Sequence, residues 1–117
     1  MADLLSVKDL PSGFWYPSSF VRVVELGLMH LEPWDVLEGS RLRWRNEGLA
    51  QRFPARELVP FAERQDNDDV ACWDLALGGE QVVIVHDFAS PGWEKRDEYL
   101  DFYAWLRQAV EDLIGFE

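Results

Sequence analysis

The sequence predicts an α+β domain in which an antiparallel β-meander sheet is packed by an early short helix and a C-terminal amphipathic helix. Three observations support this fold class. Apolar residues recur at helical spacing between residues 17 and 27, short strand-like segments with turn signals fill residues 58–87, and a helical stripe closes the chain. With 117 residues, 48% of them hydrophobic, we expect a single folded domain covering residues 1–117.

The early helix is expected to begin at Pro17, because proline suits the first turn of a helix. Gly27 is expected to end it by adopting a left-handed conformation. The residues that fall on one face, at positions i, i+3 and i+4, are Phe20, Val23 and Val24. Together these features predict about three helical turns that pack on the sheet.

Residues 28–39 are irregular, and Pro33 argues against a central strand there. Trp34 and Leu37 in this segment are expected to pack inside the protein.

Residues 41–45 alternate between arginine and apolar side chains, a period typical of a half-buried strand. Residues 46–56 predict a loop or a single helical turn, because Gly48 and Pro54 interrupt any longer periodicity. The arginines are expected to pair with acidic groups of the surrounding surface.

The meander is expected in the second half of the chain, with a loop over residues 63–69. Pro60 weakens the first strand, which is therefore an edge strand or contains a bulge. Gly78 and Gly79 supply the positive φ angles of a hairpin turn. The unbroken apolar run Val82–Val85 predicts a central strand covered by helices on one face and loops on the other. The three expected strands are residues 58–62, 70–75 and 81–87.

The last helix is expected to be capped by Asp97 and closed by Gly115. Its apolar stripe advances by one, three or four residues at each step, so it should dock on the sheet. The stripe consists of Tyr99, Phe102, Tyr103, Leu106, Val110 and Leu113.

The net charge of the chain limits which classes of partner it can attract. Its 22 acidic and 11 basic residues give a net charge of −11, which repels nucleic acid and anionic membranes and favours a basic partner. The chain start lacks the features of a secretory signal, no apolar run is long enough to span a bilayer, and Cys72 is the single cysteine. We therefore expect a cytoplasmic protein.

Several residues invite a chemical interpretation. The acidic loop at 66–69 lacks the ligand spacing and glycine of a calcium-binding loop, so a solvated connection is favoured. His86, Asp87 and Cys72 could serve a small hydrolase or metal-dependent enzyme, with His86 as base for a Cys72 nucleophile. A turn role for His86-Asp87 and an ordinary buried thiol are the simpler interpretations. We expect no catalytic residues, metal or cofactor.

Six tryptophans exceed what so small a core requires. Trp73 and Trp105 belong to well-patterned segments and are expected in the core. Trp15 and Trp93 lie among glycine, proline and polar residues, as loop residues do. Trp93 is therefore either an anchor of a binding surface or a plug at the end of the core.

The chain resembles the SUKH superfamily, which includes bacterial toxin-immunity proteins and a fungal regulator of cell-wall assembly. The resemblance consists of a hydrophobic-Pro-Phe-Ala strand, an acidic turn, a strand with an aspartate at its end, a valine-rich strand and a final amphipathic helix. An early Leu-Pro followed by a helix also matches. These features are residues 58–62, 66–69, 70–75, 82–86 and 99–106, with Leu10-Pro11 and the helix at Pro17 before them.

The resemblance implies a single SUKH-like domain that neutralises a cognate toxin, such as a nuclease, by direct protein–protein contact. The charge agrees, because a nuclease must be basic to hold phosphate. The expected partner-binding residues are Asp66, Asp68, Asp69 and Asp74, with Trp93 as anchor. The superfamily shares no catalytic residues, so no active site is implied. A regulatory scaffold, as in the fungal relatives, and the hydrolase remain alternatives.

Overall fold

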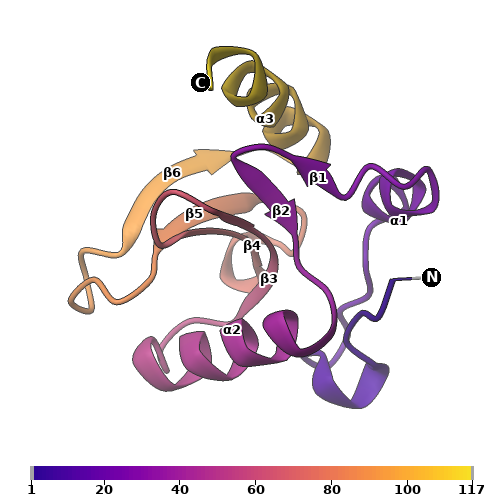
Figure 1. Ribbon diagram of the computed structural model, residues 1–117. Coiled ribbons are helices and arrows are strands. Elements are labelled where there is room, and N and C mark those ends of the chain that lie inside the picture. The colour runs from indigo at the N-terminus through magenta and orange to yellow at the C-terminus, as the bar shows by residue number, and fades with distance from the viewer. Residues whose placement is uncertain (1, 117) are drawn as a thin grey trace.

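The computed structural model describes residues 2–116 as an α+β fold, with a six-stranded antiparallel meander in the order β1 to β6 (Figure 1). The fold class predicted from the sequence is confirmed. The strands are β1 (His30–Leu31), β2 (Trp34–Val36), β3 (Leu58–Arg64), β4 (Asp69–Asp74), β5 (Val82–His86) and β6 (Lys95–Tyr99). The helices are α1 (Ser18–Glu25), α2 (Gly39–Arg52) and α3 (Phe102–Gly115), with short 3-10 turns η1 (Val7–Asp9) and η2 (Leu75–Leu77).

Helices cover both faces of the sheet. Alternate residues of β4 and β5 point to opposite sides, so Val82 and Ile84 pack with α1 and α3 while Val83 and Val85 pack with α2. The central position of β5 was predicted correctly, whereas the expectation of loops on one face was wrong. Figure 1 shows α2 below the sheet and α3 above it.

Proline is accommodated inside the sheet by a bulge. β3 pairs with β2 on one side and β4 on the other, so it is not an edge strand. Pro60 pairs with Cys72 and Ala62 with Ala71, which leaves Phe61 as the extra residue. The bulge alternative for this strand is thus confirmed, and the strand continues to Arg64.

Residues 41–45 and 46–52 form most of α2, so the predicted strand and loop there were wrong. Leu42, Arg45 and Leu49 face the sheet at positions i, i+3 and i+7, and Trp44 lies on the outer side. The helical period was hidden because a buried arginine occupies the central position of the inward face.

Residues 95–99 form the edge strand β6, and the expected Asp97 cap was wrong. Asp101 caps α3 instead, and its Oδ1 accepts a hydrogen bond from the Ala104 backbone N–H at 2.9 Å. The face that docks on the sheet carries Phe102, Trp105 and Ala109. From the predicted stripe, Tyr103, Val110 and Leu113 are partly exposed.

Residues 28–39, predicted to be irregular, contain the short strands β1 and β2, and α1 is shorter than the three turns expected. Several other local predictions are confirmed. α1 buries Phe20 and Val23, and Gly27 follows it with a φ of 78°. Gly78 and Gly79 have positive φ angles between β4 and β5. The expected core residues Trp34, Leu37, Trp73 and Trp105 are all buried.

Phe61 lies at the centre of the aromatic core. Its ring centroid is 4.4 Å from that of Trp73 and 4.9 Å from that of Trp105. We predict that Phe61→Ala lowers the free energy of unfolding by about 3–5 kcal/mol. The lost ring leaves a cavity, and the bulge holds the backbone so that the cavity cannot close. Urea unfolding measures this, with the exposed Trp15→Ala as control. A loss below about 1 kcal/mol for Phe61→Ala would contradict the central role of this ring.

Candidate functional site

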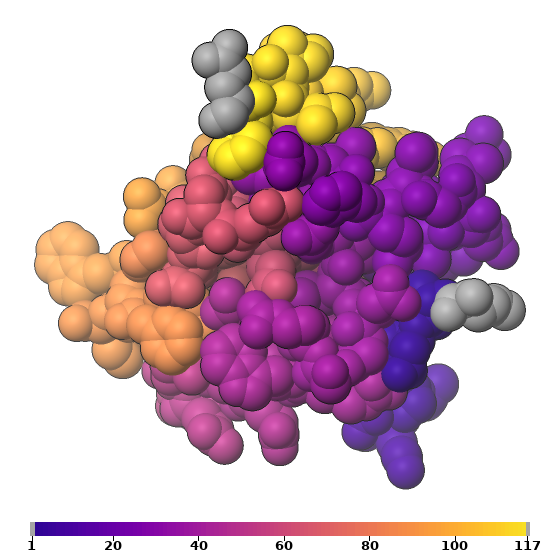
Figure 2. All heavy atoms as spheres, in the orientation of Figure 1, coloured from indigo at the N-terminus to yellow at the C-terminus, as the bar shows by residue number. Residues whose placement is uncertain are grey.

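Two connections lie side by side at one end of the sheet. They are the β3–β4 turn, residues 65–68, and the β5–β6 loop, residues 87–94. The backbone N–H of Asp87 donates to the carbonyl oxygen of Asp68 at 2.9 Å, which joins the two connections directly. The β5–β6 loop projects from the left of the molecule in Figures 1 and 2.

A buried carboxylate fixes the first end of the β5–β6 loop. Asp87 is fully buried and receives hydrogen bonds from two arginines of α2. Arg45 Nη1 lies 2.7 Å from Asp87 Oδ2, and Arg52 Nε lies 2.6 Å from Asp87 Oδ1. A second bond, from Arg52 Nη2 to Oδ2 at 2.7 Å, makes the Arg52 contact bidentate. The start of the β5–β6 loop is therefore held to α2.

A second buried carboxylate fixes the other end. Glu94 accepts a hydrogen bond from Arg56 Nε at 2.6 Å and one from the Gly92 backbone N–H at 2.6 Å. Arg56 also donates to Asp74 Oδ2 at 3.0 Å. All three clamping arginines come from α2 or the segment that follows it. We call Arg45, Arg52, Arg56, Asp87 and Glu94 the arginine clamp.

The clamp keeps its carboxylates ionised. Burial alone would raise the pKa of Asp87, but the hydrogen bonds from Arg52 and Arg45 outweigh burial and hold it below its ordinary value. Burial likewise opposes ionisation of Glu94, but the hydrogen bonds from Arg56 and from backbone N–H groups together outweigh burial and lower its pKa. A buried ion pair of this kind is stable only while both members are present.

The clamped loop presents aromatic rings to solvent. Phe88 is 53% exposed and is the one non-glycine residue of the described chain with a positive φ, 69°. The Arg52 guanidinium lies 3.9 Å from the centre of its ring. Trp44 of α2, 48% exposed, lies 6.4 Å from Phe88 between centroids. Trp93, from the same loop, is 83% exposed, so the core-plug interpretation was wrong.

The predicted partner-binding carboxylates divide into two groups. Asp66 and Asp68 are exposed in the β3–β4 turn, where Asp66 pairs with Arg64. Asp69 is nearly buried, and its Oδ1 lies 2.9 Å from His86 Nδ1. Asp74 is buried and bonded to the clamp. Of the four predicted carboxylates, Asp66 and Asp68 are therefore open to contact from outside, whereas Asp69 and Asp74 are engaged within the fold.

The candidate catalytic residues do not meet. Cys72 points to the α2 side of the sheet, and His86 shares the opposite side with Ile84. Burial raises the pKa of the Cys72 thiol, so it is not poised as a thiolate. Asp87 is engaged by arginines. Within residues 2–116, no cluster of three His, Cys, Asp or Glu side chains is arranged to hold a metal ion.

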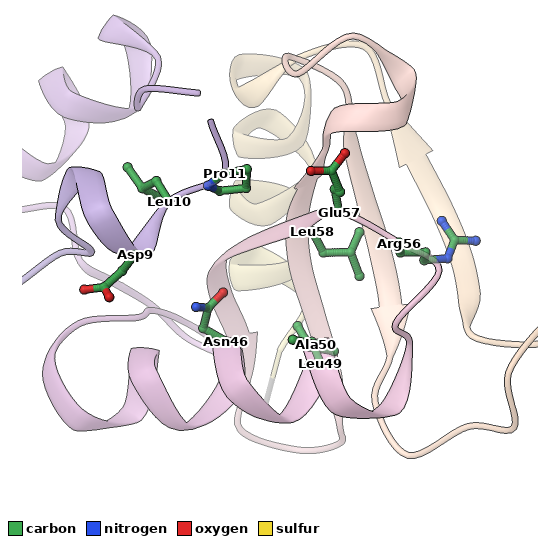
Figure 3. A pocket seen from close by; sticks show the side chains of 9 residues that line it. All are labelled: Asp9, Leu10, Pro11, Asn46, Leu49, Ala50, Arg56, Glu57 and Leu58. Carbon is green, nitrogen blue, oxygen red and sulfur yellow. The ribbon is translucent and has the colours of Figure 1, made fainter. Parts of the chain in front are cut away.

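A surface cavity of about 300 Å³ lies between residues 9–11, α2 and the start of β3 (Figure 3). Its lining mixes polar residues with apolar ones such as Leu49 and Leu58. Figure 3 shows the side chains of Asp9, Arg56 and Glu57 pointing away from one another. Arg56 is also engaged with Asp74 and Glu94. The polar groups therefore do not converge on a common point as they do around a bound small molecule.

The arginines of residues 41–45 pair with acidic groups, as predicted. Arg41 and Arg45 both bond to Glu63, at 2.6 and 2.9 Å, and Arg43 bonds to Asp3 at 2.9 Å.

None of the helices within residues 2–116 combines the length and apolar composition that crossing a membrane requires.

The sequence did not predict the arginine clamp. Of the three exposed aromatic residues near it, Trp44, Phe88 and Trp93, the sequence singled out only Trp93 as a surface anchor. Arg52, Arg56 and Glu94 were never singled out, and Phe88 and Trp44 were not considered as surface anchors. One signal was available. Residues 41–56 contain five arginines and a single acidic residue, although the whole chain is strongly acidic. Such a cluster of cations indicates ion pairs with buried carboxylates.

No protein-family model, curated protein or solved structure matches this chain. The resemblance to the SUKH superfamily therefore stays a prediction carried by the residues quoted for it.

We predict that Asp87→Asn destabilises the protein by about 3–5 kcal/mol at pH 7, since it leaves two arginines without their buried partner. The lowered pKa means that this contribution is complete above the unfolded-state value of about 3.9 and is lost as the pH falls through the folded-state pKa. Urea unfolding from neutral to acid pH should show that the variant loses part of the acid dependence. Asp66→Asn, at an exposed pair, is the control and should cost less than about 1 kcal/mol.

Gly48 gives a second test of the clamp. A Cβ at this helix position would lie 2.3 Å from Arg52 Nη2, which Asp87 holds in place. Gly→Ala in a helix normally gains about 1 kcal/mol. We predict that Gly48→Ala instead loses stability and speeds amide exchange in residues 87–94, whereas the unobstructed Gly115→Ala does neither. Unchanged exchange together with a full gain in stability would show that Arg52 is not held.

Proposed function

We propose that this chain is a non-enzymatic binding protein that neutralises a cognate basic toxin in the cytoplasm by direct contact, as the resemblance to SUKH proteins implies. The observation that supports this best is the β5–β6 loop. The arginine clamp holds both ends of this loop in place, while Phe88 and Trp93 stay exposed. Large aromatic side chains fixed at a surface are the usual energetic centres of protein interfaces.

The clamp supports this function through preorganisation. A loop that orders only on binding loses conformational entropy in the complex, and that loss lowers affinity. Here the positive φ of Phe88 is maintained in the free protein, because Asp87 Oδ1 accepts a hydrogen bond from the Phe88 backbone N–H at 2.9 Å. The backbone strain at this residue is thus compensated before a partner arrives.

Electrostatics favour a basic partner at the same end of the sheet. Asp66 and Asp68 are exposed in the β3–β4 turn, beside the root of the aromatic loop. The net charge of −11 adds a long-range attraction for a cationic protein, such as a nuclease. Charges of this kind raise the association rate and specificity, and their effect weakens as salt rises.

The residues of the hydrolase alternative are not arranged to act together. Asp87 is occupied by two arginines, and Cys72 and His86 lie on opposite faces of the sheet. The exposed surface at the loop end is therefore the best supported place of action.

The test uses the protein encoded directly beside this chain's gene, since an immunity gene is expected next to its toxin gene. We predict that the two purified proteins form a complex and that Trp93→Ala weakens it by about 30-fold or more, as loss of an interface anchor does. Trp15→Ala is the matched control, because Trp15 is 77% exposed but lies near Gly78 and Gly79, at the other end of the sheet. Titration calorimetry or surface plasmon resonance measures both affinities.

The charge component is tested with a double variant. Asp66→Asn combined with Asp68→Asn should slow association and flatten its salt dependence, while Glu80→Gln beyond β4 should leave both unchanged. Failure to form a complex, or equal losses for Trp15→Ala and Trp93→Ala, would contradict the proposal.

A further inference from the structure

α3 carries partly exposed apolar side chains beside the face that docks on the sheet. Phe102, Trp105 and Ala109 dock on the sheet. Another side of the same helix carries Tyr103, Val110 and Ile114, which are 38%, 39% and 71% exposed, and Leu113, 39% exposed, lies at its border, on nearly the same side of the helix as Phe102. These four residues, which we call the outer stripe, recur at the spacing of one helical face and its border. Figure 1 shows α3 at the outer edge of the molecule, with the sheet on one side only.

The outer stripe differs in charge from the rest of the protein. Between residues 102 and 111 the helix carries just one cation and one anion, Arg107 and Glu111. The next acid, Asp112, is turned toward β2, where its Oδ2 accepts a hydrogen bond from Trp34 Nε1 at 2.9 Å. On a chain with a net charge of −11, this face is locally neutral. It therefore offers little attraction to the basic partner proposed for the loop end.

We infer that the outer stripe is a self-association surface on which α3 of a second copy packs in the antiparallel direction. In such a pair, crossing between residues 108 and 109, Tyr103 of each copy lies level with Ile114 of the other. Arg107 lies within one residue's rise, about 1.5 Å along the axis, of the other copy's Glu111. Both ion pairs form together, because a two-fold axis makes every contact reciprocal.

This charge complementarity selects a second copy as the occupant. One cation and one anion, placed symmetrically about the centre of an apolar stripe, match the same stripe turned through 180°. The inference is independent of the proposed function. α3 and α2 lie on opposite faces of the sheet, so the dimer leaves the clamp and Phe88 uncovered.

Sedimentation equilibrium over a concentration series tests the inference, in about 0.15 M salt to screen the net negative charge. One helix pair buries less than the roughly 800 Å² per partner of a standard interface, so we expect a Kd of about 10–100 µM. The mean mass should rise from 13.6 kDa toward twice that value as concentration increases. Arg107→Glu alone and Glu111→Arg alone should each abolish the rise, and the double variant R107E/E111R should restore it.

Three outcomes would overturn the inference. They are a wild-type protein that stays monomeric at millimolar concentration, single charge reversals that leave the mass unchanged, and a double reversal that fails to recover association while remaining folded by circular dichroism. Ile114→Asp is a further variant that does not depend on the charges, and it should also give a monomer, since Ile114 is 71% exposed and its replacement leaves the core intact. Trp93→Ala should dimerise like wild type, which separates this surface from the loop end.

Discussion

The interaction on which the rest of the structure depends is the pairing of buried carboxylates with arginines from one stretch of chain. A carboxylate removed from water without a partner costs several kcal/mol, so Asp87 and Glu94 are tolerated only because Arg45, Arg52 and Arg56 reach them. These contacts also decide how α2 docks. Leu42 and Leu49 supply its apolar contact, but Arg45 stands between them on the inward face. α2 is thereby held both by apolar packing and by ion pairs that have one correct geometry.

The same pairs connect stability with the proposed function. The β5–β6 loop contributes little to the core, and a loop of this kind is ordinarily the least stable part of a fold. Because its two ends are bonded to α2 and to the segment after it, opening the loop requires breaking buried charge pairs. The rings of Phe88 and Trp44 are further oriented by guanidinium groups, of Arg52 on one ring and of Arg41 and Arg45 on the other. The geometry of this aromatic surface is therefore fixed by contacts within the protein itself.

The parts of the fold that the sequence predicts are those set by local pattern. α1, the β4–β5 hairpin and the buried Trp73 and Trp105 follow from periodicity, glycine placement and apolar content. α2 does not follow from local pattern. Its inward face includes Arg45, which is buried only because it pairs with Asp87, 42 residues away in the sequence. β6 consists largely of charged residues, which is how an exposed edge strand avoids pairing with other chains but which also looks like the first turn of a helix. For the same reason the exposed Asp66 and Asp68 could not be told from the buried Asp69 and Asp74 by residue type alone.

The distribution of paired and unpaired charge bears on what the protein contacts. All five arginines within residues 41–56 bond to acidic groups of the same chain, so the basic segment seen in the sequence is not a free cationic patch. Internal pairing removes equal numbers of both signs and leaves the acidic excess in the field that a partner meets. The phosphate of a nucleic acid is repelled by that field and finds its natural ligands already engaged. A cationic protein is attracted by it and finds, at the loop end, the exposed carboxylates of the β3–β4 turn beside aromatic rings that are already in place.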